Sequence, residues 1–157
     1  MVRIIRIVLF MLLSIPALPG QSQDYDTGLG VRGGVAWGLT VKHFVLTDGA
    51  IEGLLTARYN GVNATGLYEK HISVFDTDGF YFYYGGGAHL GLWNTEEPKP
   101  FMGTKIYAGI DGITGLEYSF DGTPLSLGMD WKPGFNLLSD FGIFYDEIAI
   151  SIRYLLR

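Results

Sequence analysis

The sequence predicts an all-β protein in which eight antiparallel strands run up and down and close into a transmembrane β-barrel, after a cleaved N-terminal signal peptide. Period-two alternation of apolar and polar residues recurs along the chain, interrupted by turn residues. Glycine, at 23 of 157 residues, is about twice as frequent as the ordinary ~7%. No segment after residue 20 sustains the 3.6-residue apolar period of an amphipathic helix.

Residues 1–20 have the three-part composition of a secretory signal peptide. Arg3 and Arg6 form a short basic start, and an apolar run over 7–13 follows. This run is shorter than the ~20 residues that a spanning helix needs, which argues against a retained membrane anchor. We therefore expect cleavage near residue 20 and a single barrel domain over 21–157.

Eight strands are expected, each close to the length of about 9–11 residues with which a tilted strand crosses a membrane. Their approximate ranges are 28–36, 38–46, 51–60, 64–74, 80–92, 106–120, 124–138 and 143–156. An even number of antiparallel strands can close without an exposed edge, as lipid requires of β-structure.

Short turns separate the first four strands. GLGVRGGVA and GLTVKHFVL have little more than Trp37 between them, and TDGA (47–50) leads to IEGLLTARYN. Asn60-Gly61 is a strong hairpin signal before ATGLYEKHISV. These spacings favour direct hairpins between sequence neighbours.

The last four strands follow the same plan with one longer connection. The turn FDTDG precedes FYFYYGGGAHLGL, and the irregular stretch NTEEPKPFMGT separates it from IYAGIDGITGLEYSF. That strand ends at Asp121-Gly122, and PLSLGMDWKPGFNLL follows. A turn over 139–142 leads to the final strand.

The alternation divides the strands into an apolar face and a charged face. The apolar face includes Leu127, Met129 and Trp131, whereas the other mixes glycines with charges. Its charged residues are Arg32, Lys42, Glu52, Arg58, Glu69, Glu117, Asp130, Lys132 and Arg153. A soluble exported lipocalin-like barrel, which would bind a ligand in an apolar cavity, would place the apolar face inside.

Glycine content favours the opposite arrangement, with the charges inside. Glycine weakens strands and has little use on a water-facing surface, but it fits a cramped interior. Charges buried in that interior must be paired, and the basic and acidic residues of this face are nearly balanced. We therefore expect the apolar face to contact lipid and the charges to form an ion-paired lumen.

Aromatic residues are expected in two belts at the membrane–water interfaces. One belt comprises Trp37, Tyr59 and Phe135, and the other Phe80, Phe82, Tyr118, Phe120 and Tyr154.

The chain resembles the small outer-membrane barrels of the OmpA/OmpX type. More closely, it resembles small barrel proteins of Bacteroidetes-type bacteria over about residues 28–157, in the phrases GLTVKHF, GLYEKH, YYGGGAHLG, GLEYSF, PLSLGMDWKPGFNL and IRY. The resemblance implies an outer-membrane location in a Gram-negative envelope, and no particular activity. Such barrels commonly end in an aromatic residue used in membrane insertion, and Tyr154 is the aromatic nearest the end of this chain.

One group of residues suggests a catalytic alternative. Glu69, His71 and Ser73 share one face of one strand, and serine, histidine and carboxylate form the catalytic group of many hydrolases. Lipid A deacylases are eight-stranded barrels with a histidine two residues before the serine, which resembles His71 and Ser73. The competing interpretation is a polar ladder in which Glu69 pairs with Arg58 or Lys42.

Composition excludes several other classes of function. Without Arg3 and Arg6 the chain has 9 basic and 16 acidic residues, so a basic nucleic-acid footprint is absent. The chain has no cysteine, and its three histidines are not at metal-ligand spacings. We expect no cofactor, no metal and no enzymatic activity. The expected partners are outer-membrane lipid and, during assembly, the barrel-insertion machinery. The expected role lies in envelope structure or surface interaction.

Overall fold

The computed structural model describes residues 25–58, 61–75, 77–94, 104–138 and 141–156, and its regular elements are all β-strands. The strands are β1 (Thr27–Gly34), β2 (Trp37–Phe44), β3 (Gly49–Arg58), β4 (Gly61–Ser73), β5 (Phe80–Asn94), β6 (Thr104–Ser119), β7 (Leu125–Trp131), β8 (Gly134–Asn136), β9 (Gly142–Phe144) and β10 (Ile148–Leu156). Among these residues, no helix is long and apolar enough to cross a membrane. The predicted signal peptide over 1–20, and Tyr59, lie outside the described residues.

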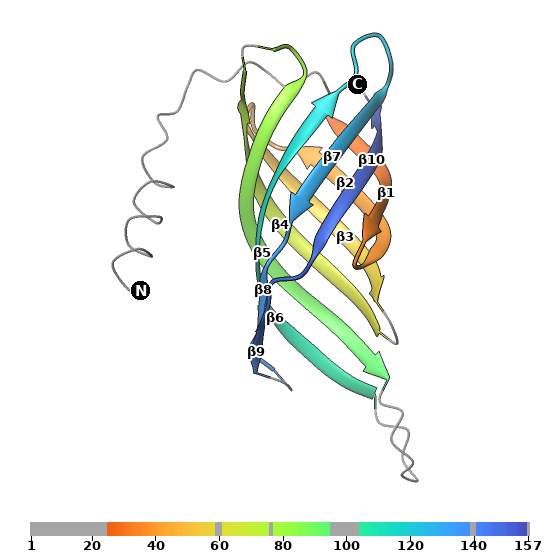
Figure 1. Ribbon diagram of the computed structural model, residues 1–157, viewed down its shortest axis with the longest axis vertical. Helices are drawn as coiled ribbons and strands as arrows, with labels where there is room; N and C mark the ends of the chain where they lie inside the picture. The colour runs from red at the N-terminus through yellow and green to blue at the C-terminus, as the bar shows by residue number, and fades with distance from the viewer. Residues whose placement is uncertain (1–24, 59–60, 76, 95–103, 139–140, 157) are drawn as a thin grey trace, which may run out of the picture.

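The strands close into one antiparallel barrel (Figure 1). Each strand pairs with its sequence neighbour from β1 to β6, β6 pairs with β7 and β8, and β10 pairs with β7 and β1. Because β7 with β8, and β9 with β10, each make one interrupted strand, the ten segments form eight. The predicted eight-stranded antiparallel barrel is confirmed.

The seventh and eighth strands are interrupted, which the alternation in the sequence does not show. Pro133 has no N–H for the sheet ladder, and β7 ends two residues before it. The Pro133 carbonyl accepts a hydrogen bond from the Gly112 N–H at 2.8 Å, and β8 then resumes pairing with β6. In the eighth strand, the break lies between β9 and β10 and contains Asp146 and Glu147.

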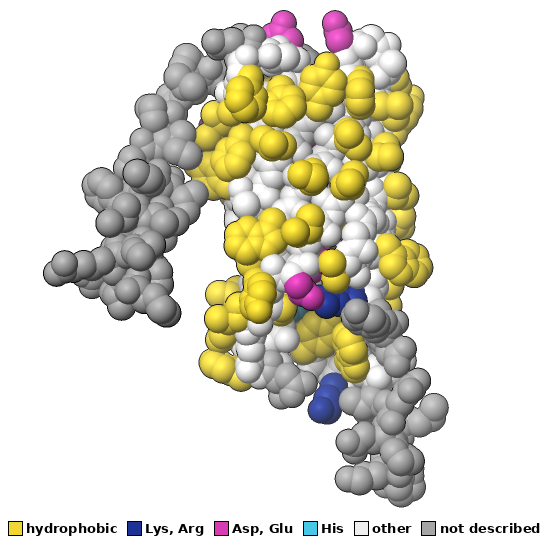
Figure 2. Space-filling model, in the orientation of Figure 1, with side chains coloured by type: hydrophobic (Ala, Val, Ile, Leu, Met, Phe, Trp, Pro, Cys, Tyr) yellow, Lys and Arg dark blue, Asp and Glu magenta, His cyan; other side chains and the backbone are white. Residues whose placement is uncertain are grey.

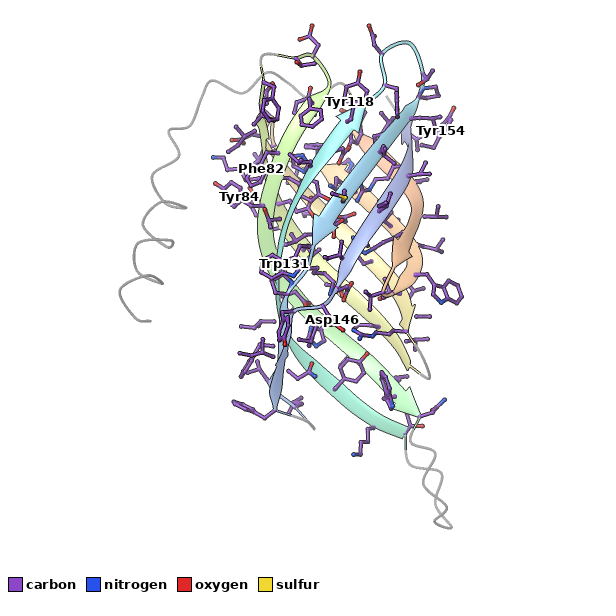
Figure 3. All side chains as sticks on the ribbon, in the orientation of Figure 1. Phe82, Tyr84, Tyr118, Trp131, Asp146 and Tyr154 are labelled. Atoms are coloured by element: carbon purple, nitrogen blue, oxygen red, sulfur yellow. The ribbon has the colours of Figure 1, made fainter. Side chains whose placement is uncertain are left out.

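The two faces of the sheet differ sharply in burial and in chemistry. Outward-facing apolar side chains such as Leu39 and Leu55 are each 57% exposed. Hydrophobic side chains are spread over the face seen in Figure 2, and Tyr154 on β10 points away from the barrel in Figure 3. Inward-facing charged side chains are buried, among them Lys42 and Glu52 at 0% exposure. The only apolar core cluster recorded among the described residues is small, formed by Leu54, Leu67, Tyr83 and Ile113. This arrangement is the inverse of a lipocalin-like barrel.

Inward-facing glycines allow the sheet to curve tightly. A Cβ added to Gly87 would collide with the carbonyl oxygen of Gly66 on β4, because the neighbouring backbone bends over the interior. Gly66 itself faces outward, and a Cβ added there would meet nothing within 4 Å. The two glycines lie in adjoining register positions, but only Gly87 is required by the close approach of the neighbouring backbone.

Gly87→Ala is expected to destabilise the barrel by about 1–3 kcal/mol, because backbone must move to admit the methyl group. Gly66→Ala is the matched control, and it should be neutral or stabilising by up to about 1 kcal/mol, since it restricts the unfolded chain without a clash. Urea unfolding of both variants in detergent micelles measures the difference. Equal stability of the two variants would contradict this account of the curvature.

Candidate functional site

The interior of the barrel holds two clusters of buried charges. The Lys42 cluster comprises Lys42, Glu52, Glu69, Glu117 and Arg153. The Arg32 cluster comprises Arg32, Asp111, Asp130, Lys132 and Glu147. Every one of these side chains is 6% exposed or less.

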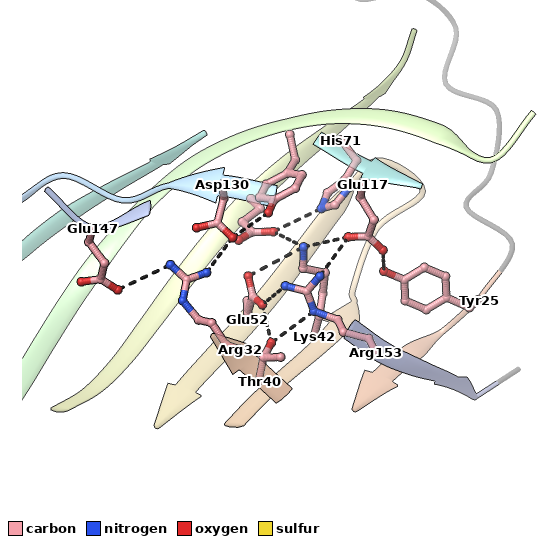
Figure 4. Close-up of polar contacts among 12 residues, drawn as sticks. Tyr25, Arg32, Thr40, Lys42, Glu52, His71, Glu117, Asp130, Glu147 and Arg153 are labelled. Atoms are coloured by element: carbon pink, nitrogen blue, oxygen red, sulfur yellow. Dashed lines mark hydrogen bonds and ion pairs between the residues drawn. The ribbon is translucent and has the colours of Figure 1, made fainter. Parts of the chain in front are cut away.

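In the Lys42 cluster, one ammonium group serves three carboxylates (Figure 4). The Lys42 Nζ lies 2.8 Å from Glu69 Oε2, 3.1 Å from Glu117 Oε2 and 3.7 Å from Glu52 Oε2. The Arg153 guanidinium lies 2.5 Å from Glu52 Oε1 and 3.4 Å from Glu117 Oε2. The five residues come from β2, β3, β4, β6 and β10, so the cluster ties together most of the barrel wall.

Neutral side chains add hydrogen bonds to this cluster. The Tyr25 hydroxyl donates to Glu117 Oε1 at 2.5 Å, and the Thr40 hydroxyl donates to Glu52 Oε1. Thr40 Oγ1 also accepts a hydrogen bond from Arg153 Nε at 3.2 Å. Buried charges are tolerated when such additional hydrogen bonds accompany the ion pairs.

The Arg32 cluster continues the network toward the other end of the barrel. Arg32 Nη1 lies 2.6 Å from Asp130 Oδ2, and Arg32 Nη2 lies 3.4 Å from Glu147 Oε1. Lys132 Nζ lies 3.0 Å from Glu147 Oε2 and 3.4 Å from Asp111 Oδ1. The Tyr83 hydroxyl donates to Asp130 Oδ2 at 3.1 Å.

Two aromatic side chains connect the clusters to their surroundings. The Tyr83 ring centroid lies 4.0 Å from Lys42 Nζ, so this residue touches both clusters. His89 places Nδ1 2.9 Å from Asp111 Oδ2 and Nε2 2.9 Å from Asn136 Oδ1. His89 therefore anchors β8 to β5 and β6 across the interior.

The positions of the sequence-predicted charges fall into two groups. Arg32, Lys42, Glu52, Glu69, Glu117, Asp130, Lys132 and Arg153 are buried inside. Arg58 differs: it lies at the end of β3, and it pairs with Asp146, Nη2 to Oδ2, at 2.6 Å. Glu69 pairs with Lys42 and not with Arg58.

Sequence reasoning missed two carboxylates of the Arg32 cluster. Asp111 lies six residues before Glu117 on β6, so the even spacing places it on the inward face of that strand. Glu147 lies six residues before Arg153, and it keeps the inward parity of β10 although it directly precedes that strand. That parity was available in the sequence. The glycines around Asp111 and the break beside Glu147 weaken the alternation there.

The Arg58–Asp146 pair lies at the barrel end and is partly open to solvent, with the Asp146 side chain 52% exposed. Its hydrogen bond from Arg58 holds the pKa of Asp146 below its ordinary value. A carboxylate whose pKa is lowered by folding adds to the free energy of unfolding at every pH above its ordinary pKa. This contribution is lost as the pH falls through the lowered pKa.

Asp146→Asn is therefore expected to lower the free energy of unfolding at pH 7 by less than about 1 kcal/mol, as is typical of exposed pairs. The difference from the unchanged protein should vanish at a pH well below the pKa of Asp146, where that carboxyl is protonated in both states. Urea midpoints of the two proteins at the two pH values measure it. A difference that is the same at both would contradict the ion pair as its source.

Glu69 and His71, two members of the catalytic alternative, are in contact inside the barrel. His71 Nε2 lies 3.2 Å from Glu69 Oε2, and the imidazole ring stacks on Tyr83 at 5.1 Å between centroids. The described residues contain no group of three or more His, Cys, Asp or Glu side chains arranged to hold a metal ion.

Comparison with solved structures finds the crystal structure of the N-terminal β-barrel domain of Pseudomonas aeruginosa OprF. The TM-score is 0.65, with 85% of this chain and 98% of that domain covered and 11% of residues identical. The two share a fold. At this identity the likeness concerns the architecture alone. No protein-family model and no curated protein matches the chain. The closer resemblance to Bacteroidetes-type barrels stays a prediction.

Proposed function

We propose that the chain is a non-enzymatic integral outer-membrane β-barrel with a closed, ion-paired interior, and that it contributes to envelope structure or to interactions at the cell surface. The inverted distribution of side chains carries this proposal. Packing against water would not explain why the apolar Met129 and Ile152 are 55% and 52% exposed while the charged Arg153 is fully buried. Hydrocarbon around the barrel does, because it solvates the apolar face.

A structural role fits the contents of the interior. Eight strands enclose a space that side chains can fill, and here charged residues bond directly across it, Lys42 of β2 with Glu117 of β6 and Arg153 of β10 with Glu52 of β3 (Figure 4). Such a filled interior disfavours a general diffusion pore. Export by the predicted signal peptide and insertion by the barrel-assembly machinery are parts of the same proposal.

Cell fractionation tests the location. The protein is expected in the outer-membrane fraction, to resist extraction by alkaline carbonate, and to migrate differently on gels with and without heating, since closed barrels resist unheated detergent. Recovery in the soluble periplasmic fraction would overturn the proposal.

The non-enzymatic part has its own test. Lipid A mass spectra from cells that produce the protein, the Ser73→Ala variant or neither are expected to be identical. A deacylated lipid A species that depends on both the protein and Ser73 would instead establish the hydrolase.

A further inference from the structure

The apolar outer surface of the barrel has unequal height around its circumference. The outward row of β2 runs from Trp37 through the exposed His43 to Val45, just past the strand, a distance of eight residues. On β6 the outward row runs from Phe120 to Ile106, fourteen residues apart. With about 3.3 Å per residue and a strand tilt of about 40°, the two rows span about 20 Å and about 35 Å along the barrel axis. A typical apolar band is about 25 Å tall.

The extra height lies at one end only. In Figure 1, β5, β6, β8 and β9 continue well below the β1–β2 turn. In Figure 2, the hydrophobic side chains at the upper end stop at a nearly even level. Tilting the whole barrel would misalign that even end, so tilt alone does not match both ends to a flat bilayer.

Among the described residues, the outward-facing positions of the extended wall are uncharged, and the exposed Lys105 directly precedes Ile106 at its end. Cross-strand neighbours continue the outward face from β5 through β6 and β8 to β9, with Ala88 opposite Ile110, Ile110 opposite Phe135, and Phe135 opposite Ile143. Large apolar side chains on this part of the surface are 44–79% exposed: Leu90, Leu92, Ile106, Ile110, Phe141 and Ile143. This surface is continuous with the belt above it.

The short side ends differently. Trp37, 67% exposed, is the last outward apolar residue of β2, and its register partner Ala57 directly precedes Arg58. The Arg58–Asp146 ion pair therefore lies just beyond the apolar row on this side. The free edge of β9 faces the same side, because β9 pairs with β8 alone. Its unpaired backbone groups can stay hydrated there, as an edge strand requires.

We propose that the barrel meets its bilayer along a slanted outer boundary, with acyl chains reaching Ile106 on the long wall but ending at Trp37 on the β1–β2 side. This inference rests on the proposed membrane location. The lipid beside β1 and β2 is thinner than the lipid beside β5 and β6, because a bilayer adjusts its thickness locally to hydrophobic mismatch. The occupant of the extended apolar wall is lipid, since that wall continues the lipid-facing belt and its described outward-facing positions have no charge to pair with a protein.

Single-tryptophan reporters test the boundary. In a background with Trp37, Trp93 and Trp131 replaced by phenylalanine, Ile106→Trp reports the long wall and Met129→Trp reports the middle of the belt. A third protein keeps native Trp37 alone. Each is refolded into phosphatidylcholine vesicles with bromine on the acyl chains, and iodide is the aqueous quencher.

Ile106→Trp is expected to lose about as much emission to brominated chains as Met129→Trp, and little to iodide. Trp37 lies nearer the bilayer centre along the barrel axis than Ile106, but its emission should nevertheless be quenched more by iodide than that of Ile106→Trp. Quenching of Ile106→Trp by iodide alone, with Met129→Trp quenched by bromine, would overturn the slanted boundary and leave the membrane location intact. Protection of Ile106→Trp from both quenchers would overturn lipid as the occupant in favour of a second copy of the chain, the only other protein in the vesicles. Failure of bromine to quench Met129→Trp would overturn the membrane location itself.

Discussion

Replacing Lys42 with methionine is expected to lower the free energy of unfolding by about 3–5 kcal/mol, the usual effect of removing one partner of a buried ion pair. Lys42 Nζ is within 4 Å of three carboxylates, and its removal leaves Glu69 without its closest cation. Methionine keeps the approximate length of the side chain, so the decrease in the free energy of unfolding measures the loss of the charge and not the loss of side-chain volume. Urea unfolding of the refolded protein in micelles, followed by tryptophan fluorescence, measures it.

Lys70→Met supplies the matched control for this experiment. Lys70 forms an exposed pair with Asp48, Nζ to Oδ2 3.1 Å apart, with side chains 41% and 39% exposed. The same substitution there should change stability by less than about 1 kcal/mol. Similar effects at Lys42 and Lys70 would show that the interior is far more hydrated than the geometry indicates.

Met129→Lys is expected to destabilise the barrel in a bilayer by about 2–4 kcal/mol, because the new charge would face hydrocarbon at the middle of the belt. Met129 is 55% exposed and lies between Leu116 and Ile150 on neighbouring strands. On a water-facing surface the same change would usually stay within about 0.5 kcal/mol. Unfolding equilibria in vesicles measure the effect.

Val45→Lys serves as the control for depth. Val45 lies just beyond β2, near the other end of the apolar row, and is 45% exposed. Charges near the interface cost only about 0–1 kcal/mol. A Met129→Lys effect no larger than the Val45→Lys effect would contradict a lipid-facing belt.

Much of this fold could be predicted from the sequence, because the period-two alternation indicates both where a strand lies and which of its two faces is apolar. Leu127, Met129 and Trp131 are exposed on β7, and Ser126, Gly128 and Asp130 between them are buried, as expected. Turn chemistry located the strand ends to within a few residues. The order of the strands followed from hairpins between neighbours.

The ion pairs inside the barrel were harder to predict from the sequence than the strands. Parity places a side chain inside but does not say which opposite wall it meets, since this depends on the stagger of the strands. Lys42 on β2 and Glu117 on β6 are 75 positions apart and lie on opposite walls, yet Lys42 Nζ donates to Glu117 Oε2 at 3.1 Å. The contribution of neutral residues such as Tyr25, Thr40 and Tyr83 was missed for the same reason. Arg58 shares the inward parity but lies too near the barrel end to reach Glu69.

The seam between β1 and β10 has a kinetic consequence. It brings Thr27 opposite Leu156 and Gly34 opposite Ala149, so the ring cannot be completed until the last strand is present. Contacts between residues so distant in sequence form slowly, and both unjoined edges offer open hydrogen-bonding groups to other chains in the meantime. The nascent polypeptide therefore needs protection from aggregation for the whole interval before closure.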